Sequence, residues 1–314
     1  MALLVWSTGP RLLLSLVERV GRRFPLVVVI YALHVCVRGV AVWRTAPDGA
    51  VPFRDVLRAQ FSAEAVEMLT FTGPFLAEPT KGWLLTRRGL GMPDAFAAVI
   101  TEHLLYAVVS TWLMAAAASL LLMHGMLPSA VWPAAAVVLI VTIAFLAAFA
   151  YAAVTGVGVI VPILRRLRLV IDAWGADGAE RAARAFEPIE HAIVTFLHRR
   201  YPRVAEVIAI EAFAQLMLIA EVWILVASLG FSVSRSTPLI IEGGVKFIGI
   251  AFAFIPGQFG AFEGVYAFLA HAVGLPAAAG LTLALVRRAR SLLVAAGGLV
   301  VLSASGAVPG RSQA

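Results

Sequence analysis

The sequence has few charged residues and one cysteine, and both shortages restrict the class of protein it can encode. Charged residues make up 14% of the 314 residues, whereas 61% are hydrophobic. A soluble domain of this length would need much more charged surface, so a soluble globular fold is excluded. Because Cys36 is the only cysteine, an internal disulfide and a cysteine-based metal site are excluded as well.

Long apolar runs fill most of the chain. A helix needs roughly 20 apolar residues to cross a hydrocarbon layer of about 30 Å. We predict an all-α polytopic integral membrane helical bundle, built as one domain over residues 1–314. For residues 1–24 two alternatives stay open, an interfacial helix and a further membrane span. The clear candidate spans are residues 25–43, 94–122, 131–161, 204–229 and 277–303, and the interrupted ones are about 56–72 and 238–273.

The only extended polar region is an arginine-rich stretch, residues 162–203, in which apolar residues recur at helical spacing. It predicts two amphipathic helices at the membrane interface, split near Gly175–Gly178. The positive-inside rule places this linker in the cytoplasm. It divides the chain into repeat 1, about 25–161, and repeat 2, about 204–303. The net charge of +7 favours anionic lipid headgroups over nucleic acid, because the arginines flank spans.

The two halves share a register. In each, a glutamate is followed 11 residues later by a glycine-leucine pair and 24 residues later by a charged residue inside a span. Tracing the spans outward from the linker gives the halves opposite topology, which is typical of alternating-access transporters. The matched positions are Glu78, Gly89 and Glu102 in the first half and Glu263, Gly274 and Arg287 in the second.

A segment in the second half, FIPGQFGAFEG at residues 254–264, interrupts an apolar run with Pro256, Gly257, Gly260 and Glu263. Proline obstructs the preceding helical turn, and glycine permits a sharp reversal. Irregular backbone at membrane depth is tolerated only where protein or a water-filled cavity covers its polar groups. We therefore predict a broken, re-entrant helical hairpin at this segment.

A similar segment interrupts the first half. TFTGPFLAEPTKG, residues 70–82, carries Pro74, Pro79 and two glycines. It predicts a second re-entrant hairpin, so that two half-helix ends point toward a shared cavity at the midplane. The exposed amides at the start of a half-helix form a natural anion site.

Several charged residues lie inside apolar runs, where burial of a charge is costly. Arg287 and Arg290 are three residues apart and share one helix face, whereas Arg288 points elsewhere. One interpretation is that these arginines contact the phosphate of a lipid headgroup, since the guanidinium binds phosphate through two hydrogen bonds. The other interpretation, which stays open, is internal pairing with the nearby glutamates Glu263, Glu242 or Glu102.

We predict a substrate-binding and translocation site in which Glu263 and its repeat counterpart Glu78 gate the site or couple it to protons. The predicted site residues are Glu263, Pro256, Gly257, Gly260, Arg287, Arg288, Arg290, Pro74, Glu78, Lys81 and Glu102.

Other polar residues give weaker signals. Glu211 and Glu221 lie ten residues apart on nearly one face of a span, and simple pairing with Lys246 or a cavity water is favoured over proton coupling. The histidines have no metal-ligand spacing. No phosphate-binding loop or nucleophile elbow is present. We therefore expect no catalytic residues, no metal and no cofactor.

Several motifs together resemble a known family. They are VRGVAVWR at residues 37–44, the break TGPFLAEPTKG before a basic glycine-leucine stretch, and IPGQFGAFEG followed by AVGLP and an arginine-bearing last span. The chain resembles the transmembrane, or flippase-like, domain of lysylphosphatidylglycerol synthetases, including stand-alone YbhN-like and HpnL-like members. The likeness extends from about residue 25 to 303. The first break differs from the PGG-like element usual in the family.

The resemblance implies that the chain moves a membrane lipid between leaflets, either an anionic phospholipid, a glycolipid or a hopanoid-type lipid. It also implies a location in the bacterial cytoplasmic (inner) membrane. Eleven residues follow the last predicted span, so we expect no soluble transferase domain and no lysyltransferase activity. Two alternatives stay open, a non-catalytic partner of a lipid-modifying or glycosyl-transferring enzyme and a membrane-embedded lipid-modifying enzyme. Homo-oligomerisation is also left open.

Overall fold

A computed structural model describes residues 15, 18–70, 73–123, 125, 132–167, 176–232, 234–251 and 260–306. Within these ranges every regular element is a helix and no strand occurs. Three of the helices are long and apolar enough to cross a membrane, α3 (Phe24–Thr45), α6 (Met92–Met123) and α10 (Tyr201–Ser228). The prediction of an all-α helical membrane bundle is thus confirmed.

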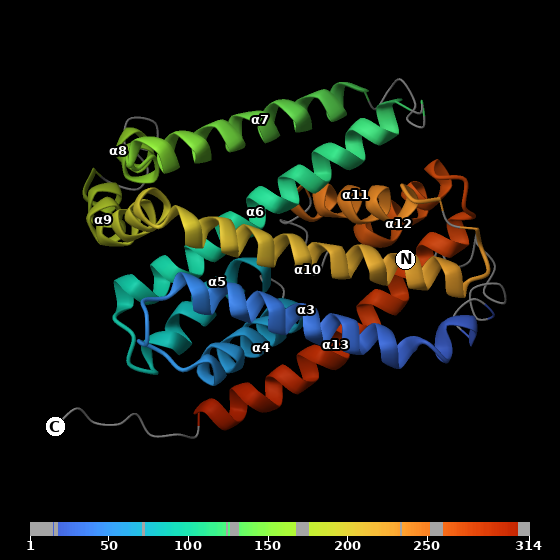
Figure 1. Ribbon diagram of the computed structural model, residues 1–314, viewed down its shortest axis with the longest axis horizontal. Coiled ribbons are helices and arrows are strands. Elements are labelled where there is room, and N and C mark those ends of the chain that lie inside the picture. The colour runs from blue at the N-terminus through green and yellow to red at the C-terminus, as the bar shows by residue number, and fades with distance from the viewer. Residues whose placement is uncertain are drawn as a thin grey trace.

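The first half consists of a long helix, two short helices and a second long helix. After α3, the chain forms α4 (Phe53–Leu69) and α5 (Gly73–Thr86), and then α6. A further helix, α7 (Trp132–Thr155), completes this half and lies along one side of the bundle (Figure 1). The predicted spans 25–43 and 94–122 match α3 and α6 to within a few residues, whereas the predicted span 131–161 extends past the end of α7 at Thr155 and into α8.

The second half repeats this order. Helix α10 is followed by α11 (Thr237–Ala251), α12 (Ala261–Ala272) and the long α13 (Ala277–Gly306). Figure 1 shows that α3 and α10 run in opposite directions, as do α6 and α13. The two series of helices are therefore inverted relative to each other.

Each pair of short helices ends in an equivalent turn, located at the matched glycine-leucine pair. Gly89 and Gly274 both adopt the left-handed conformation, with φ of 99° and 79°. Leu90 N donates to Leu85 O at 3.3 Å, and Leu275 N donates to Ala270 O at 2.8 Å. A non-glycine residue would be strained at such a φ, so glycine here sets where α5 and α12 stop.

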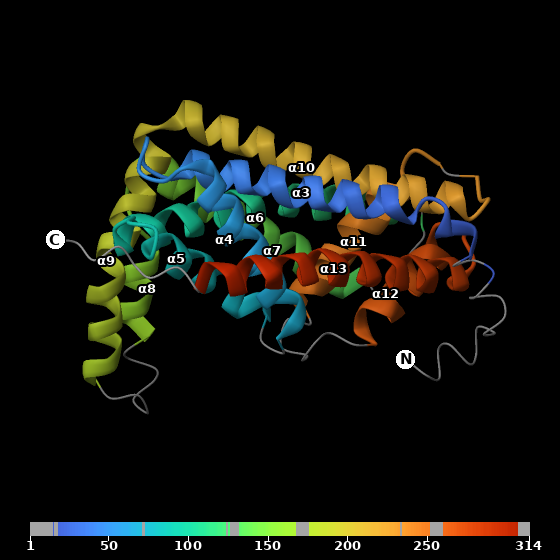
Figure 2. The ribbon, with the colours of Figure 1, turned by 90° about the horizontal axis from the view of Figure 1, so that it is seen from below.

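The polar linker forms α8 (Ile160–Leu167) and α9 (Ala176–Arg199). Figure 2 shows both at one end of the bundle, with α9 lying across it. Ala183 and Ile193 on α9 are buried, whereas its arginines Arg184 and Arg199 are exposed. Two amphipathic helices split near Gly175–Gly178 were predicted here. Helix α9 begins at Ala176 and is amphipathic, whereas residues 168–175 lie outside the described residues.

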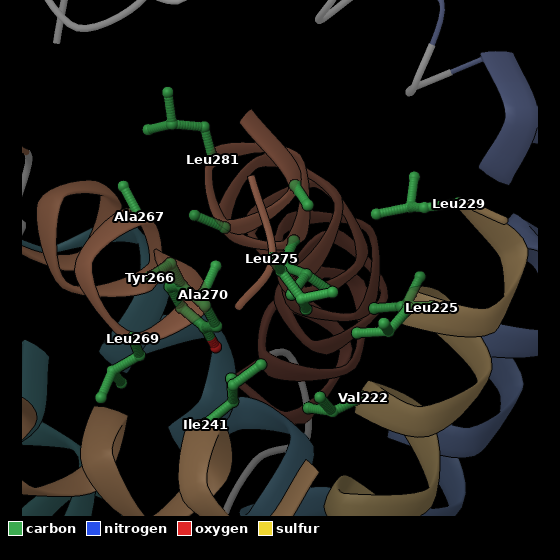
Figure 3. Packing of buried hydrophobic residues seen from close by; sticks show 14 of the residues in the cluster. Val222, Leu225, Leu229, Ile241, Tyr266, Ala267, Leu269, Ala270, Leu275 and Leu281 are labelled. Atoms are coloured by element: carbon green, nitrogen blue, oxygen red, sulfur yellow. The ribbon is translucent and has the colours of Figure 1, made fainter. Parts of the chain in front are cut away.

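The largest hydrophobic core lies in the second half. Leu225 of α10, Ile241 of α11 and Ala270 of α12 come from three different helices and face the start of α13 around Leu275 (Figure 3). All four of these side chains are at most 7% exposed. This core holds the second hairpin against α10 and α13.

Two glycines allow the halves to approach closely. A side chain at Gly298 of α13 would clash with the backbone carbonyl of Phe61 in α4. Similarly, a Cβ at Gly243 of α11 would lie 2.6 Å from the carbonyl oxygen of Leu113 in α6. Small residues commonly permit such contacts between membrane helices. Each hairpin thus packs closely against the long helix of the other half.

The predicted helix breaks need one correction. In the first hairpin the chain leaves the helix after Leu69 and resumes it at Gly73, whereas Pro79 lies inside α5 and does not end it. A single proline can be accommodated within a membrane helix when its surroundings satisfy the freed carbonyl. In the second hairpin α11 ends at Ala251 and α12 begins at Ala261. Pro256 and Gly257 lie outside the described residues.

Candidate substrate-binding site

Four charged residues of the first half meet inside the bundle, together with one from α10. We call Arg38, Glu78, Lys81, Glu102 and Glu211 the acid-rich cluster. Arg38 Nη2 lies 2.6 Å from Glu102 Oε1, and Lys81 Nζ lies 2.9 Å from Glu78 Oε2 and 3.6 Å from Glu102 Oε2. Glu102 and Glu211 are 0% exposed and Lys81 is 1% exposed. Three carboxylates therefore share two cations, and Glu78 is the most exposed member, with 20% of its side chain accessible.

A second group of five charged residues lies between α10, α11 and α13. We call Glu221, Glu242, Lys246, Arg287 and Arg290 the cation-rich cluster. Arg290 Nε lies 2.5 Å from Glu221 Oε1, and Arg287 Nη1 lies 2.7 Å from Glu242 Oε2. Lys246 Nζ lies 3.5 Å from Glu242 Oε1, and Arg287 Nε lies 3.6 Å from Glu221 Oε1. Here three cations share two carboxylates.

Tyrosines connect the two clusters. Lys246 Nζ donates a hydrogen bond of 3.1 Å to the Tyr106 hydroxyl, and the Arg38 guanidinium lies 4.2 Å from the centre of the same ring. The Arg290 guanidinium lies 3.6 Å from the centre of the Tyr31 ring. Because a cation over an aromatic face is attracted to it, Tyr106 joins the clusters into one polar network.

Tyr31 extends this network to the first hairpin. Its hydroxyl donates a hydrogen bond to the carboxylate of Glu64 in α4. Glu64 is 6% exposed. The cation-rich cluster therefore reaches a third carboxylate only through a tyrosine and not by a direct ion pair.

Glu263 stands in the first turn of α12, as the sequence predicted for the residue at the second break. Its Oε2 accepts a hydrogen bond of 2.7 Å from Gly260 N, which caps the helix. Its Oε1 lies 2.6 Å from Arg288 Nη1. A carboxylate at a helix N-terminus is also stabilised by the helix dipole. Arg288 keeps 26% of its side chain exposed, in contrast to 9% for Arg287 and 4% for Arg290.

The two halves contain equivalent ion pairs with the charges exchanged. Arg38 and Glu221 each lie eight positions before the C-cap of their helix, Ala46 in α3 and Leu229 in α10. Glu102 and Arg287 are the matched charges of α6 and α13. The pair Arg38–Glu102 in one half therefore corresponds to the pair Glu221–Arg287 in the other.

Two further contacts follow the same correspondence. His103 Nδ1 lies 3.4 Å from Glu78 Oε1, at the position where Arg288 contacts Glu263. Lys81, which contacts Glu102, is replaced in the second half by Tyr266, whose hydroxyl accepts a hydrogen bond of 2.5 Å from Arg287 Nη1. The repeat thus preserves which positions touch and not which charge each position carries.

The predicted site residues fall into three groups, those that contact one another, those that form other internal ion pairs, and those without such a contact among the described residues. The structure brings Glu78, Lys81 and Glu102 together, and it forms the internal ion pairs of Arg287, Arg288 and Arg290. Arg287 and Arg290 share the buried face, and Arg288 points away from it, as the spacing predicted. Contact of these arginines with a lipid phosphate stays a prediction. Pro74 lies in the first turn of α5, Gly260 caps α12, and Pro256 and Gly257 fall outside the described residues.

Some predicted partners were wrong. Lys246 pairs with Glu242 and not with Glu211 or Glu221. The arginine that pairs with Glu102 is Arg38 and not one of the arginines of α13. These errors share a cause, because pairing depends on how each helix is rotated about its axis.

Arg38 is the residue that sequence reasoning missed. It contacts Glu102 and Glu211 and lies over Tyr106, so it holds the acid-rich cluster together. A signal was available, since Arg38 is a charged residue inside the apolar run 25–43. An ionisable residue in such a position is by default a candidate for a functional site.

A cavity of about 230 Å³ lies apart from this network, where α9 crosses the ends of α3 and α6. Thr45, Thr101 and Arg200 are among its lining residues. Among the described residues, no three or more histidines, cysteines or carboxylates are arranged to hold a metal ion. The site is therefore a network of buried ion pairs and tyrosines at the meeting point of two inverted halves.

Long apolar helices around a buried charged network define this molecule as a polytopic membrane protein. The family model described as the lysylphosphatidylglycerol synthase TM region matches residues 1–298. The chain therefore belongs to the lysylphosphatidylglycerol synthase TM region family, as its motifs predicted. No curated protein and no solved structure matches the chain.

Proposed function

We propose that this protein translocates an amphipathic lipid, either a phospholipid or a lipid-linked molecule, between the leaflets of the bacterial cytoplasmic membrane. The observation that carries the proposal is the buried charge network at the meeting point of two inverted helical hairpins. Inverted halves around a polar site are typical of alternating-access transport. Buried charge inside a membrane bundle commonly marks a substrate or ion pathway.

Arg288 is the residue that we propose as the first contact for an anionic headgroup. Its guanidinium is the most exposed of the three on α13, and its partner Glu263 caps the adjacent hairpin helix. A lipid phosphate that displaces Glu263 from Arg288 would leave the glutamate at the helix start. Binding at Arg288 would thus be coupled to the position of α12.

This proposal includes no catalytic step. Family membership supports a membrane role related to lipids, and the buried charged residues of the two clusters are engaged in ion pairs with one another. We propose accordingly that the chain is not itself an enzyme. The exposed face of α9 would serve a partner enzyme if one binds.

Reconstitution into liposomes with fluorescent lipids of several headgroups tests the function. We expect the wild-type protein to move at least one lipid between leaflets and Glu263→Gln to lose most of that activity. Glutamine keeps an oxygen that can accept the Gly260 amide, so the variant removes the charge and retains the cap. Glu206→Gln is the matched control, because Glu206 forms an exposed pair with Arg44. Absence of movement for every headgroup tested would refute the proposal.

A further inference from the structure

Glu211 of α10 differs from every other carboxylate of the two clusters. It is 0% exposed, and neither of its oxygens has a hydrogen-bond partner. The cation within ion-pair distance is Arg38, whose Nε lies 3.8 Å from Glu211 Oε2. The same guanidinium is already engaged by Glu102 at 2.6 Å. Two fully buried carboxylates therefore share one arginine.

The other cations and histidines of this part of the bundle already have partners. Lys81 of α5 contacts Glu78 at 2.9 Å, and Lys246 of α11 contacts the Tyr106 hydroxyl at 3.1 Å. His34 of α3 uses Nδ1 to contact the carbonyl of Ala214 at 3.0 Å. His103 of α6 faces Glu78. Among the described residues, no cation other than Arg38 lies within ion-pair distance of Glu211.

An uncharged acceptor stands beside Glu211. Gln215 lies one helical turn further along α10, is 3% exposed, and has a side-chain oxygen without a hydrogen-bond partner. Its amide nitrogen faces Ser110 Oγ at 3.5 Å. Glu102 Oε2 also lacks a hydrogen-bond partner. A donor placed on Glu211 would therefore have Glu102 Oε2 and Gln215 Oε1 as candidate acceptors.

A proton supplies that donor. Two carboxylates close together in a low dielectric cannot both be ionised without a large electrostatic cost, whereas a protonated carboxyl group donates through its O–H. We propose that Glu211 and Glu102 form a proton-binding carboxyl pair that holds one proton between them. With this proton bound, the two remaining negative charges of the acid-rich cluster match the charges of Arg38 and Lys81.

Our proposal assigns the pair a role in transport, and only this role rests on the proposed function. Release of the proton would leave an uncompensated negative charge beside Arg38. Exposure of the pair to water on one side of the membrane would stabilise that charge by hydration. A proton gradient would in this way favour one of the two conformations of an alternating-access transporter, open to one side or to the other.

The pair is tested without any transport measurement by infrared difference spectroscopy of the protein in lipid nanodiscs. We expect the carbonyl band of a protonated carboxyl group in the wild type at neutral pH, with loss of the band at alkaline pH. Glu211→Gln should lack this band. Glu206→Gln, on the same helix but exposed, should keep it. A wild type without the band, or a band unchanged in Glu211→Gln, would overturn the proposal.

Thermal stability gives a second, independent readout. Glutamine has the shape of a protonated glutamate, so we expect Glu211→Gln to unfold at the wild-type temperature or above it. If Glu211 were instead the ionised partner of Arg38, the same variant would unfold at a clearly lower temperature or fail to fold. Either of those results would count against the proton-binding pair.

The two proposals fail in distinguishable ways. A carboxyl band in a protein that moves no lipid would refute the proposed function and leave the proton site intact. Lipid movement without the band would refute the proton site and leave the function intact. If both are present, movement in the wild type should respond to an imposed pH gradient, and Glu211→Gln should lose that response.

Discussion

The acid-rich cluster and the cation-rich cluster are built on the same geometry with opposite charge. In the first, Arg38 of α3, the first long helix of that half, pairs with Glu102 of α6, the long helix that follows its hairpin. In the second, Glu221 of α10 pairs in the same way with Arg287 of α13. Three carboxylates then share two cations on one side, and three cations share two carboxylates on the other. Position is thus preserved between the halves, and the sign of the charge is not.

This difference predicts which residue is indispensable in each half. Where carboxylates are in excess, the loss of a cation leaves a buried negative charge without a partner. Where cations are in excess, the loss of a carboxylate has the corresponding effect. Breaking a buried pair by removing one partner costs about 3–5 kcal/mol, whereas a residue with a substitute partner nearby costs less.

The largest effect is expected for Arg38→Leu. This variant leaves Glu102 with Lys81, which already contacts Glu78, and leaves Glu211 with no cation within ion-pair distance. We expect a loss of about 3–5 kcal/mol in the free energy of unfolding. Reversible unfolding in detergent micelles measures it.

Arg287→Leu is the comparison for that variant. Glu221 keeps Arg290 and Glu242 keeps Lys246, so the loss should be smaller than for Arg38→Leu. Equal losses, or the reverse order, would show that the charge imbalance between the halves does not govern stability.

The next effect concerns the carboxylates. Here the loss in the free energy of unfolding should be larger in the cation-rich cluster than in the acid-rich cluster, the reverse of the order for the arginines. Glu221→Gln leaves Arg290 without any carboxylate in ion-pair contact, because Glu221 is its partner at 2.5 Å. We expect Glu221→Gln to lower the free energy of unfolding by about 3 kcal/mol.

Glu102→Gln should have a milder effect, since Arg38 can retain Glu211 and Lys81 can retain Glu78. The same unfolding measurement compares the two variants. A greater loss for Glu102→Gln than for Glu221→Gln would contradict the assignment of the first cluster as acid-rich.

The close contacts between the halves give an intermediate effect. Gly298→Ala places a methyl group against the Phe61 carbonyl, and Gly243→Ala places one against the Leu113 carbonyl. Overpacking of this kind costs about 1–3 kcal/mol. Gly297→Ala is the matched control, because a Cβ there meets nothing within 4 Å. Thermal unfolding should show both contact variants below the wild type and the control equal to it, and a destabilised control would show that helix position alone is responsible.

The smallest effect is expected outside the membrane, at the exposed end of α10. The hydrogen bond from Arg203 lowers the pKa of Asp48 below its usual range. A lowered folded-state pKa means that the pair contributes stability above the unfolded-state pKa and loses it as the pH falls through the folded-state value. Asp48 is exposed, so Asp48→Asn should change the unfolding temperature only slightly at neutral pH and not at all in strong acid. A large change in the unfolding temperature at neutral pH would contradict the expectation that this exposed pair contributes little to stability.

The two halves also show how far the sequence predicted the site. The spacing of Glu78 and Glu263 from Gly89 and Gly274 predicted a repeat, and the structure has equivalent turns at the two glycines. Local chemistry sufficed there, because a glycine with positive φ needs no distant partner. The partners of Lys246 and Glu102 were predicted wrongly, since several spans offered an opposite charge at similar depth.

The sequence by itself determined that the chain is an all-helical membrane protein, where its long helices begin and end, and that each half contains an interrupted hairpin. Hydropathy and helix-stopping residues act over a few turns, so they can be recognised without knowledge of the fold. Only the tertiary structure decided that Arg38 joins Glu102 and that Glu211 is left without a cation of its own. Those contacts depend on the rotation and packing of helices far apart in the chain, and an ionisable residue carries no local signal that selects one buried partner among several.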